Sequence, residues 1–187
     1  MGSGYNGYGS DGVNSAPNTP AVTIQNCYAV AEITGTGDMG GILGTEPSVE
    51  CCWGNGDGTI CNNYFKGTLT ETSGKGNVGG IVGFLKSFDK YQGFDNNFYA
   101  KECGTKSGIG KIETIITKSH PKYGAAYGID YEFDEQKVCI GMSGAAFNDN
   151  SLASKLNAGK YSTKNWMQGK KEGYPVLSKE PVVYQIS

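Results

Sequence analysis

Hydrophobic and polar residues alternate in the same way in two stretches of the chain. Residues 24–44 read IQNCYAVAEITGTGDMGGILG, and residues 60–83 read ICNNYFKGTLTETSGKGNVGGIVG. In each stretch an alternating segment leads into a Gly-rich segment and then into a short apolar run. Alternation with a period of two is typical of a half-buried strand. Each copy therefore predicts a strand, a turn and a second, shorter strand.

A third copy begins at FDNNFYAKEC, so the period is about 35 residues. Cys103 of this copy falls in the same column as Ile33 and Leu69 of the first two copies. The predicted repeat positions of the three copies are Ile24, Asn26, Tyr28, Gly40 and Gly41, then Ile60, Asn62, Tyr64, Gly79 and Gly80, then Phe94, Asn96 and Phe98.

One such unit is too small to bury its own apolar side, so the copies must stack. The fold class predicted is mainly β: a parallel β-solenoid in which equivalent side chains form ladders, followed by an irregular C-terminal cap with one short helix. The glycine pairs are expected at corners, where the backbone takes a positive φ or a neighbouring strand approaches closely.

Two regions are expected. Residues 1–103 form the repeat, and residues 104–187 form the C-terminal capping region, because the repeat is lost there and the end of a solenoid needs a polar cover. Gly4-Tyr5 matches the end of a copy, which predicts further repeats in the parent chain.

The capping region contains one helical pattern, within residues 142–158. Phe147, Leu152 and Leu156 fall near one face of this predicted helix. Asn150 or Ser151 is the expected N-cap and Gly159 the expected stop. Irregular strands are expected in residues 104–141, and the last residues are expected to be extended.

Composition agrees with a turn-rich β protein and narrows the function. The chain has 30 Gly and 12 Tyr in 187 residues, and its net charge is −2. All 16 basic residues are Lys, scattered among 18 carboxylates, so no nucleic-acid partner is expected. No run of eighteen apolar residues is present, so no membrane insertion is predicted, and no secretory signal is recognisable at Met1.

The six cysteines do not suggest a metal site. They include no CxxC pair, and there is one His in the chain. A disulfide between Cys52 and Cys61 could close a loop, but buried free thiols are the favoured interpretation, since free Cys is among the most buried residue types.

The repeats resemble the GLUG-motif family, whose hallmark is GGIVG followed some way on by NCY. The matching residues are Gly79–Gly83, the variant Gly40–Gly44, and Asn26–Tyr28 with its degenerate copies Asn62–Tyr64 and Asn96–Phe98. The resemblance implies a bacterial cell-surface or secreted protein, usually a multidomain adhesin or a segment beside a peptidase domain. It carries no family-wide catalytic residues.

Two Gly-rich segments have the spacing of a dinucleotide-binding loop. Gly74–Gly79 and Gly35–Gly40 both read GxGxxG. Such a loop must precede a helix, whereas a strand pattern follows both copies, so a repeated turn is favoured and no cofactor is expected.

No complete catalytic set is recognisable, and no catalytic residue is assigned. Glu32, Thr68 and Glu102 occupy one column, where two carboxylates two rungs apart would be roughly 9–10 Å from each other. That is the edge of the range for an inverting glycosidase, and surface carboxylates are favoured. His120 is interpreted as a solvated loop residue, and Asn55–Gly58 as a turn rather than a calcium loop.

The leading hypothesis is a non-enzymatic adhesive or spacing module that presents an extended face to a glycan or a host surface protein. The insertions at 45–59 and 84–93 are the expected contact sites. The tyrosines outside the ladder offer either a glycan-stacking surface or packing under loops; they are Tyr5, Tyr8, Tyr91, Tyr123, Tyr127, Tyr131 and Tyr161. The alternative is a polysaccharide-processing enzyme or an accessory domain of a surface peptidase.

Overall fold

The computed structural model describes residues 23–45, 58–87, 91–114, 138–160 and 162–179. Within these ranges the chain is mainly β, with one α-helix and one 3-10 turn, as expected from the alternation pattern. His120, Cys51, Cys52, most of Asn55–Gly58 and the cores of both insertions lie outside the described residues.

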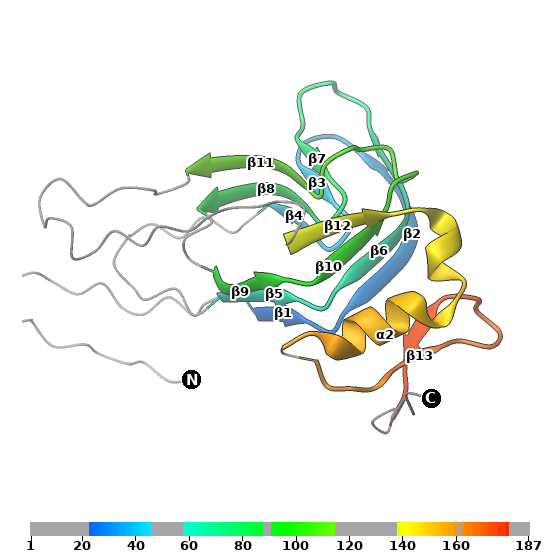
Figure 1. Cartoon of the computed structure of the whole chain (residues 1–187). Coiled ribbons are helices and arrows are strands. Elements are labelled where there is room, and N and C mark those ends of the chain that lie inside the picture. The colour runs from blue at the N-terminus through cyan, green and yellow to red at the C-terminus, as the bar shows by residue number, and fades with distance from the viewer. Residues whose placement is uncertain (1–22, 46–57, 88–90, 115–137, 161, 180–187) are drawn as a thin grey trace, which may run out of the picture.

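Equivalent strands of successive copies form three parallel sheets (Figure 1). The first sheet contains β1 (Thr23–Gln25), β5 (Gly58–Cys61) and β9 (Tyr91–Asp95), in that order. The long sheet has the order β12 (Cys139–Met142), β10 (Asn97–Ala100), β6 (Tyr64–Glu71) and β2 (Tyr28–Gly35). The third sheet has the order β11 (Ile109–Thr114), β8 (Val82–Ser87) and β4 (Leu43–Thr45), and β3 (Met39–Gly40) pairs with β7 (Val78–Gly79).

Equivalent residues of successive copies lie directly opposite each other. Tyr28 pairs with Tyr64, and Tyr64 with Phe98, in the long sheet. Ile24 pairs with Ile60 in the first sheet. The pairing of β2 with β6 keeps one register over all eight residues. The columns predicted from the repeat are therefore present.

An asparagine turns the chain from the first sheet into the long sheet in every copy. Asn26, Asn62 and Asn96 have φ values of 54°, 54° and 51°. Asn tolerates this left-handed conformation better than most residues, because its short polar side chain can bond locally. The repeated Asn is thus a corner residue, a role that its place in the pattern had not indicated.

The next residue of the later copies is also Asn, and its side chain bonds to the preceding copy. The Asn63 amide donates to the Ile24 carbonyl at 2.9 Å and accepts from the Cys27 N–H at 2.9 Å. Asn97 repeats this one copy later, donating to Ile60 at 2.8 Å and accepting from the Asn63 N–H at 3.3 Å. Both side chains are fully buried. They satisfy backbone groups inside the stack that water cannot reach.

The glycine pairs make room for the coil of the next copy. A Cβ at Gly41 would lie 2.1 Å from Cγ of Phe65, and one at Gly80 would lie 2.3 Å from Cγ of Tyr99. Neither glycine has a positive φ, so glycine is needed at these positions because the ring of the next copy lies so close to the backbone. The aromatic ring of each later copy therefore packs over the corner of the copy before it.

The interior of the coils is filled by the inward side of these strands. Ile60, Phe65, Ile81, Val82 and Leu85 are fully buried in one cluster that spans the three sheets. Tyr64 and Phe98 belong to a second cluster, on the outer side of the long sheet.

The pairing continues beyond residue 103, where the sequence loses the repeat. Ile109 of β11 pairs with Val82 of β8, and Cys139 of β12 pairs with Asn97 of β10, both in parallel. Two strands of the expected capping region are therefore regular members of the stack rather than irregular strands.

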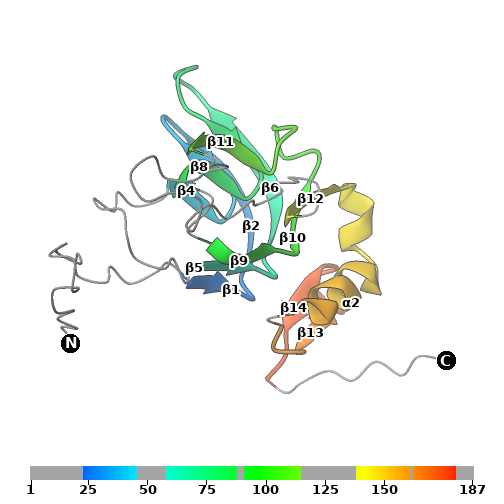
Figure 2. The same cartoon turned by 60° about the vertical axis from the view of Figure 1, so that its left-hand side comes forward.

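The rest of the C-terminal region lies beside the stack rather than across its end (Figure 2). It consists of η3 (Gly144–Phe147), α2 (Asn150–Ala158) and the antiparallel pair β13 (Trp166–Gln168) and β14 (Pro175–Leu177), and is called the C-terminal unit below. The N-cap of α2 is Asp149, whose carboxylate accepts from the Ser151 N–H at 2.8 Å, so the predicted N-caps Asn150 and Ser151 were wrong. Gly159 ends the helix as predicted.

Replacing the corner glycine Gly80 by Ala should destabilise the fold strongly. The added Cβ would overlap the Tyr99 ring, and overpacking of this kind costs about 1–3 kcal/mol, or roughly 3–10 °C in Tm for a chain of this size. Gly35→Ala is the matched control, because an added Cβ there meets nothing within 4 Å. Thermal unfolding followed by circular dichroism checks this, and equal Tm values for the two variants would contradict the packing described.

Candidate interaction surface

The outer side of the long sheet is the most distinctive surface of the described chain. Side chains alternate between the two sides of a strand, so one alternate set of β2 and β6 faces outward. One end of this side is covered by the C-terminal unit and the other is exposed. The exposed and partly exposed residues of this side are called the outer strip below. They are Tyr28, Val30, Glu32 and Thr34 of β2 and Lys66, Thr68 and Thr70 of β6, with Tyr28 and Lys66 at the end that meets the C-terminal unit.

The C-terminal unit packs on the aromatic column of the long sheet. Tyr28 and Tyr64 stack with ring centroids 5.2 Å apart, and the Trp166 ring lies 5.9 Å from the first and 5.6 Å from the second. The Tyr64 hydroxyl donates to the Pro175 carbonyl. Burial, together with the nearby Tyr28 and Tyr174 hydroxyls, raises the pKa of Tyr64. This hydroxyl links the long sheet to the C-terminal unit.

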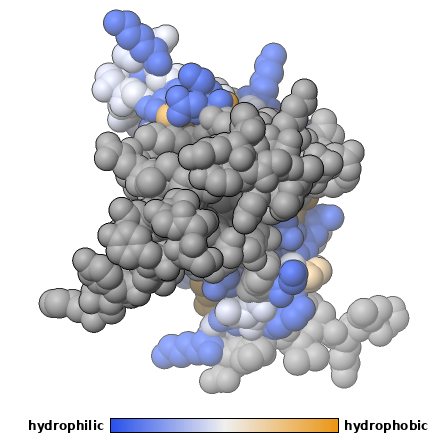
Figure 3. Space-filling model, turned by 90° about the vertical axis from the view of Figure 1, so that its left-hand side faces the viewer, coloured by the Kyte–Doolittle hydropathy of each residue, from blue (hydrophilic) through white to orange (hydrophobic). Residues whose placement is uncertain are grey.

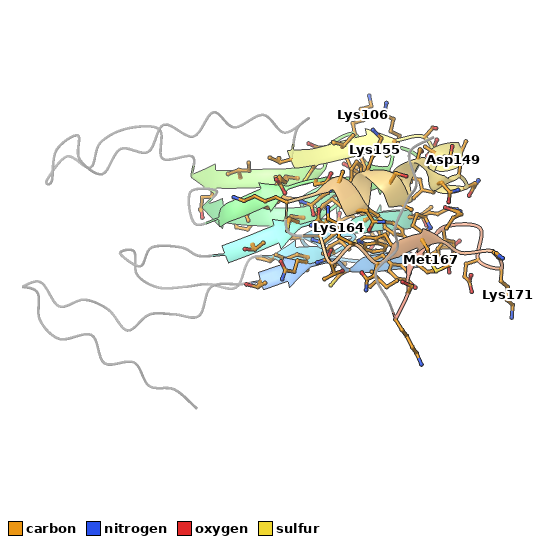
Figure 4. All side chains as sticks on the ribbon, turned by 60° about the horizontal axis from the view of Figure 1, so that its bottom comes forward. Lys106, Asp149, Lys155, Lys164, Met167 and Lys171 are labelled. Carbon is orange, nitrogen blue, oxygen red and sulfur yellow. The ribbon has the colours of Figure 1, made fainter. Side chains whose placement is uncertain are left out.

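The C-terminal end of α2 contacts the corner residues Asn62 and Asn96. The Asn96 side chain donates to the Lys155 carbonyl at 3.1 Å and to the Asn62 side chain at 2.6 Å. A Cβ at Gly159 would lie 1.8 Å from Oδ1 of Asn62. Gly159 has φ −58°, so it is required here by contact and not by a left-handed turn. In Figure 4, α2 lies across the stacked strands, and Lys171 points away from them.

Apolar and polar groups are mixed on the outer strip. Tyr28 is 39% exposed and Val30 is 42% exposed, and Leu177 of the neighbouring β14 is 40% exposed. The Lys66 ammonium donates to Asn148 at 3.0 Å and lies 5.5 Å from the Tyr174 ring centre. The strip therefore offers hydroxyls, one carboxylate, one ammonium and apolar area. Such a surface is suited to binding, and the alternation of β2 is the sequence signal that could have located it.

The carboxylate column considered from the sequence is only partly formed. Glu32 pairs with Thr68 as predicted. Glu102 follows the end of β10 and accepts from the Gly144 N–H at 3.0 Å, so it is tied to the C-terminal unit. Within the described ranges no three His, Cys, Asp or Glu residues are grouped as a metal site would require.

The two GxGxxG segments are stacked turns. Each leads into a strand, β3 or β7, and the Met39 N–H donates to the Asn77 carbonyl at 2.8 Å.

The Glu71 carboxylate accepts hydrogen bonds from the turn that follows it and from the equivalent turn of the preceding copy. It accepts from the Ser73 hydroxyl at 2.5 Å and from the N–H groups of Ser73, Gly37 and Gly74. These hydrogen bonds, led by that of the Ser73 hydroxyl, lower the pKa of Glu71 to about 2.

The described cysteines are free thiols. Cys61, Cys103 and Cys139 are buried, as the sequence favoured, whereas Cys27 is exposed. Cys61 is free, and Cys52, the partner considered from the sequence, lies outside the described residues. Burial raises the pKa of Cys61 to about 12, so its thiol stays protonated near neutral pH and is a poor nucleophile.

The side view in Figure 3 shows mostly hydrophilic residues where the described part of the chain reaches the surface at the top of the molecule. The seven tyrosines considered for glycan stacking cannot be placed on any surface, because the side chains of all seven lie outside the described residues.

No family model matches the chain, and no solved structure matches it. A "Putative Gly-rich membrane protein" from Evansella cellulosilytica is 30% identical over 115 residues, which are 60% of this chain and 12% of that protein. The chain thus spans about an eighth of that relative's length. Neither described helix has the length and apolar character needed to cross a bilayer.

The pKa of Glu71 predicts a specific loss of stability in acid. Its value in the folded chain is below the ordinary value of 4.5, so its contribution is fully present above about pH 4.5 and is lost as the pH falls toward 2. Glu71→Gln should therefore lower Tm at pH 6 and flatten the fall in Tm between pH 4.5 and 2.5. Calorimetry of both proteins across this range checks it, and parallel Tm curves would contradict the hydrogen bonding described.

Proposed function

We propose that the chain is a β-solenoid module of GLUG-like repeats that serves a bacterial cell-surface or secreted protein as a non-enzymatic adhesive or spacing element. Its ligand is a glycan or a host surface protein, which it binds on the outer strip. No cofactor takes part.

The path of the backbone supports a solenoid. Each of the first two copies runs along the first sheet, turns at its asparagine and follows the long sheet. It then passes a Gly-rich turn, the short strand β3 or β7 and the glycine pair, and continues in the third sheet. The next copy pairs with it in parallel in all three sheets. A coil of this kind is rigid along its axis because every rung is bonded to its neighbours, which suits a spacing element.

The exposed outer strip is the observation that carries the binding role. It follows two strands paired in one register, and it mixes hydroxyls with the apolar surface of Tyr28 and Val30. Sugars are recognised by this combination of hydrogen bonds and apolar contact. Insertions in a solenoid also collect on its faces, so the insertions at 45–59 and 84–93 are further candidate contacts.

A surface location is supported by the relative, whose name describes a membrane protein of a bacterium. Because this chain corresponds to 12% of that protein, the module is proposed to work within a longer polypeptide that supplies the anchor and any further repeats.

Binding without turnover distinguishes this function from the alternative, a polysaccharide-processing enzyme or an accessory domain of a surface peptidase. The purified chain is applied to a glycan array, and reducing-sugar release is measured on each glycan that binds. Thr68→Lys, in the outer strip, should weaken binding about tenfold or more, because it places a bulky charge on the proposed binding surface. Thr36→Lys, at an exposed turn residue, is the matched control.

Sugar release that disappears in Glu32→Gln or Glu102→Gln would favour the enzyme instead. Failure of the chain to bind any glycan or host surface protein would overturn the adhesive role.

A further inference from the structure

Within the described ranges, the strand at the N-terminal end of the stack is paired on one side only. Among the described residues, β2 is the last strand of the long sheet, and β1 and β4 are the last strands of the other two. The carbonyls of Cys27 and Gly35 accept from the N–H groups of Tyr64 in β6 and of Thr72 directly after it. Backbone groups alternate in direction along a parallel strand, so the N–H and C=O groups of Tyr28, Val30, Glu32 and Thr34 point away from β6.

This edge lacks the features that usually prevent one exposed sheet edge from pairing with another. Natural edge strands are short, bulged, or carry Lys or Pro. β2 has eight residues with the sequence YAVAEITG, contains neither Lys nor Pro, and pairs with β6 without a register shift. Its one charge is Glu32, and it carries two of the most exposed large apolar side chains, Tyr28 and Val30. Such an edge is a template for pairing with another strand.

The first copy lacks the side chains with which the later copies contact the copy before them. The second and third copies bond to their predecessor through Asn63 and Asn97. They also place Phe65 or Tyr99 over its corner glycine. The first copy has Cys27 in the Asn column and Ala29 in the aromatic column. Neither side chain can make these contacts, so the edge favours a different occupant.

We propose that this edge binds the same edge of a second copy of the chain, with the two β2 strands antiparallel about a two-fold axis. A two-fold contact uses one surface twice and closes the assembly at a dimer. The proposal rests on the stacked strands and not on the adhesive role.

Charge and backbone direction select one register. Centring the axis on Ala31 pairs Val30 with Glu32 of the second copy and Tyr28 with Thr34 of the second copy. All four residues have outward backbone groups, so each pair can exchange two hydrogen bonds. Glu32 then lies opposite an apolar residue instead of another Glu32, which avoids like-charge repulsion.

The mass of the 187-residue chain in solution tests the interface. Light scattering after size exclusion, over a range of concentrations, should show a dimer. Val30→Lys should weaken it by about tenfold or more in dissociation constant, because both symmetry-related strands lose a cross-strand contact and gain a charge. Thr70→Lys is the matched control, since Thr70 is equally on the outer side but belongs to the interior strand β6, and it should leave the dimer unchanged.

A cysteine cross-link tests the register. In a chain with Cys27, Cys51 and Cys52 changed to Ser, Ala31→Cys should give a disulfide-linked dimer under mild oxidation, because the two Cα atoms would be about 4.5 Å apart. Thr34→Cys should not, since its counterpart in the second copy is Tyr28.

A monomer at every concentration, a dimer that survives Val30→Lys, or equal cross-linking of the two cysteine variants would overturn the proposal. Circular dichroism confirms that each variant is folded. If the unchanged chain binds a glycan but stays monomeric, the proposed function stands without the dimer, and if it dimerises but binds no glycan, the dimer stands without the proposed function.

Discussion

The hydrogen bonds that Asn63 and Asn97 make to the preceding copy hold the coils of this chain in register. Each amide supplies both a donor and an acceptor, and each is matched to a carbonyl and an N–H group that are separated from water. A buried backbone group left without a partner costs about 1–3 kcal/mol, so a coil that slipped by one residue would lose several such contacts at once. The register of the long sheet is fixed by this constraint as much as by its apolar columns.

The other features of the fold follow from the close, in-register stacking of successive copies. Glycine is needed at positions 41 and 80 because the ring of the next copy is held so close to the corner. The stacking of Tyr28 on Tyr64 is possible because their strands share one register. That aromatic column in turn forms the platform on which Trp166 and α2 pack, so the C-terminal unit is bound to several coils together. The C-terminal unit therefore holds successive copies together through its contacts on the outer side of the long sheet.

Sequence periodicity was sufficient to predict the columns, and contacts between distant parts of the chain were not predictable from it. The spacing of Ile24, Ile60 and Phe94 gave the correct neighbours, because a repeat that must stack has few other registers available. Asn63 and Asn97 looked like degenerate versions of Cys27, since their importance lies in backbone groups that a pattern of side chains does not reveal. The path of α2 depends on the fit of Gly159 against an asparagine 97 residues earlier in the chain, and no local signal encodes that.

Exchange of the side-chain amide protons of Asn63 and Asn97, followed by NMR in heavy water, tests the central claim most directly. The account predicts that these protons exchange only with global unfolding, orders of magnitude more slowly than those of the exposed Asn150 on α2. Exchange of Asn63 and Asn97 at the rate of Asn150 would contradict it, because the amides would then be open to water and could not be holding one coil to the next.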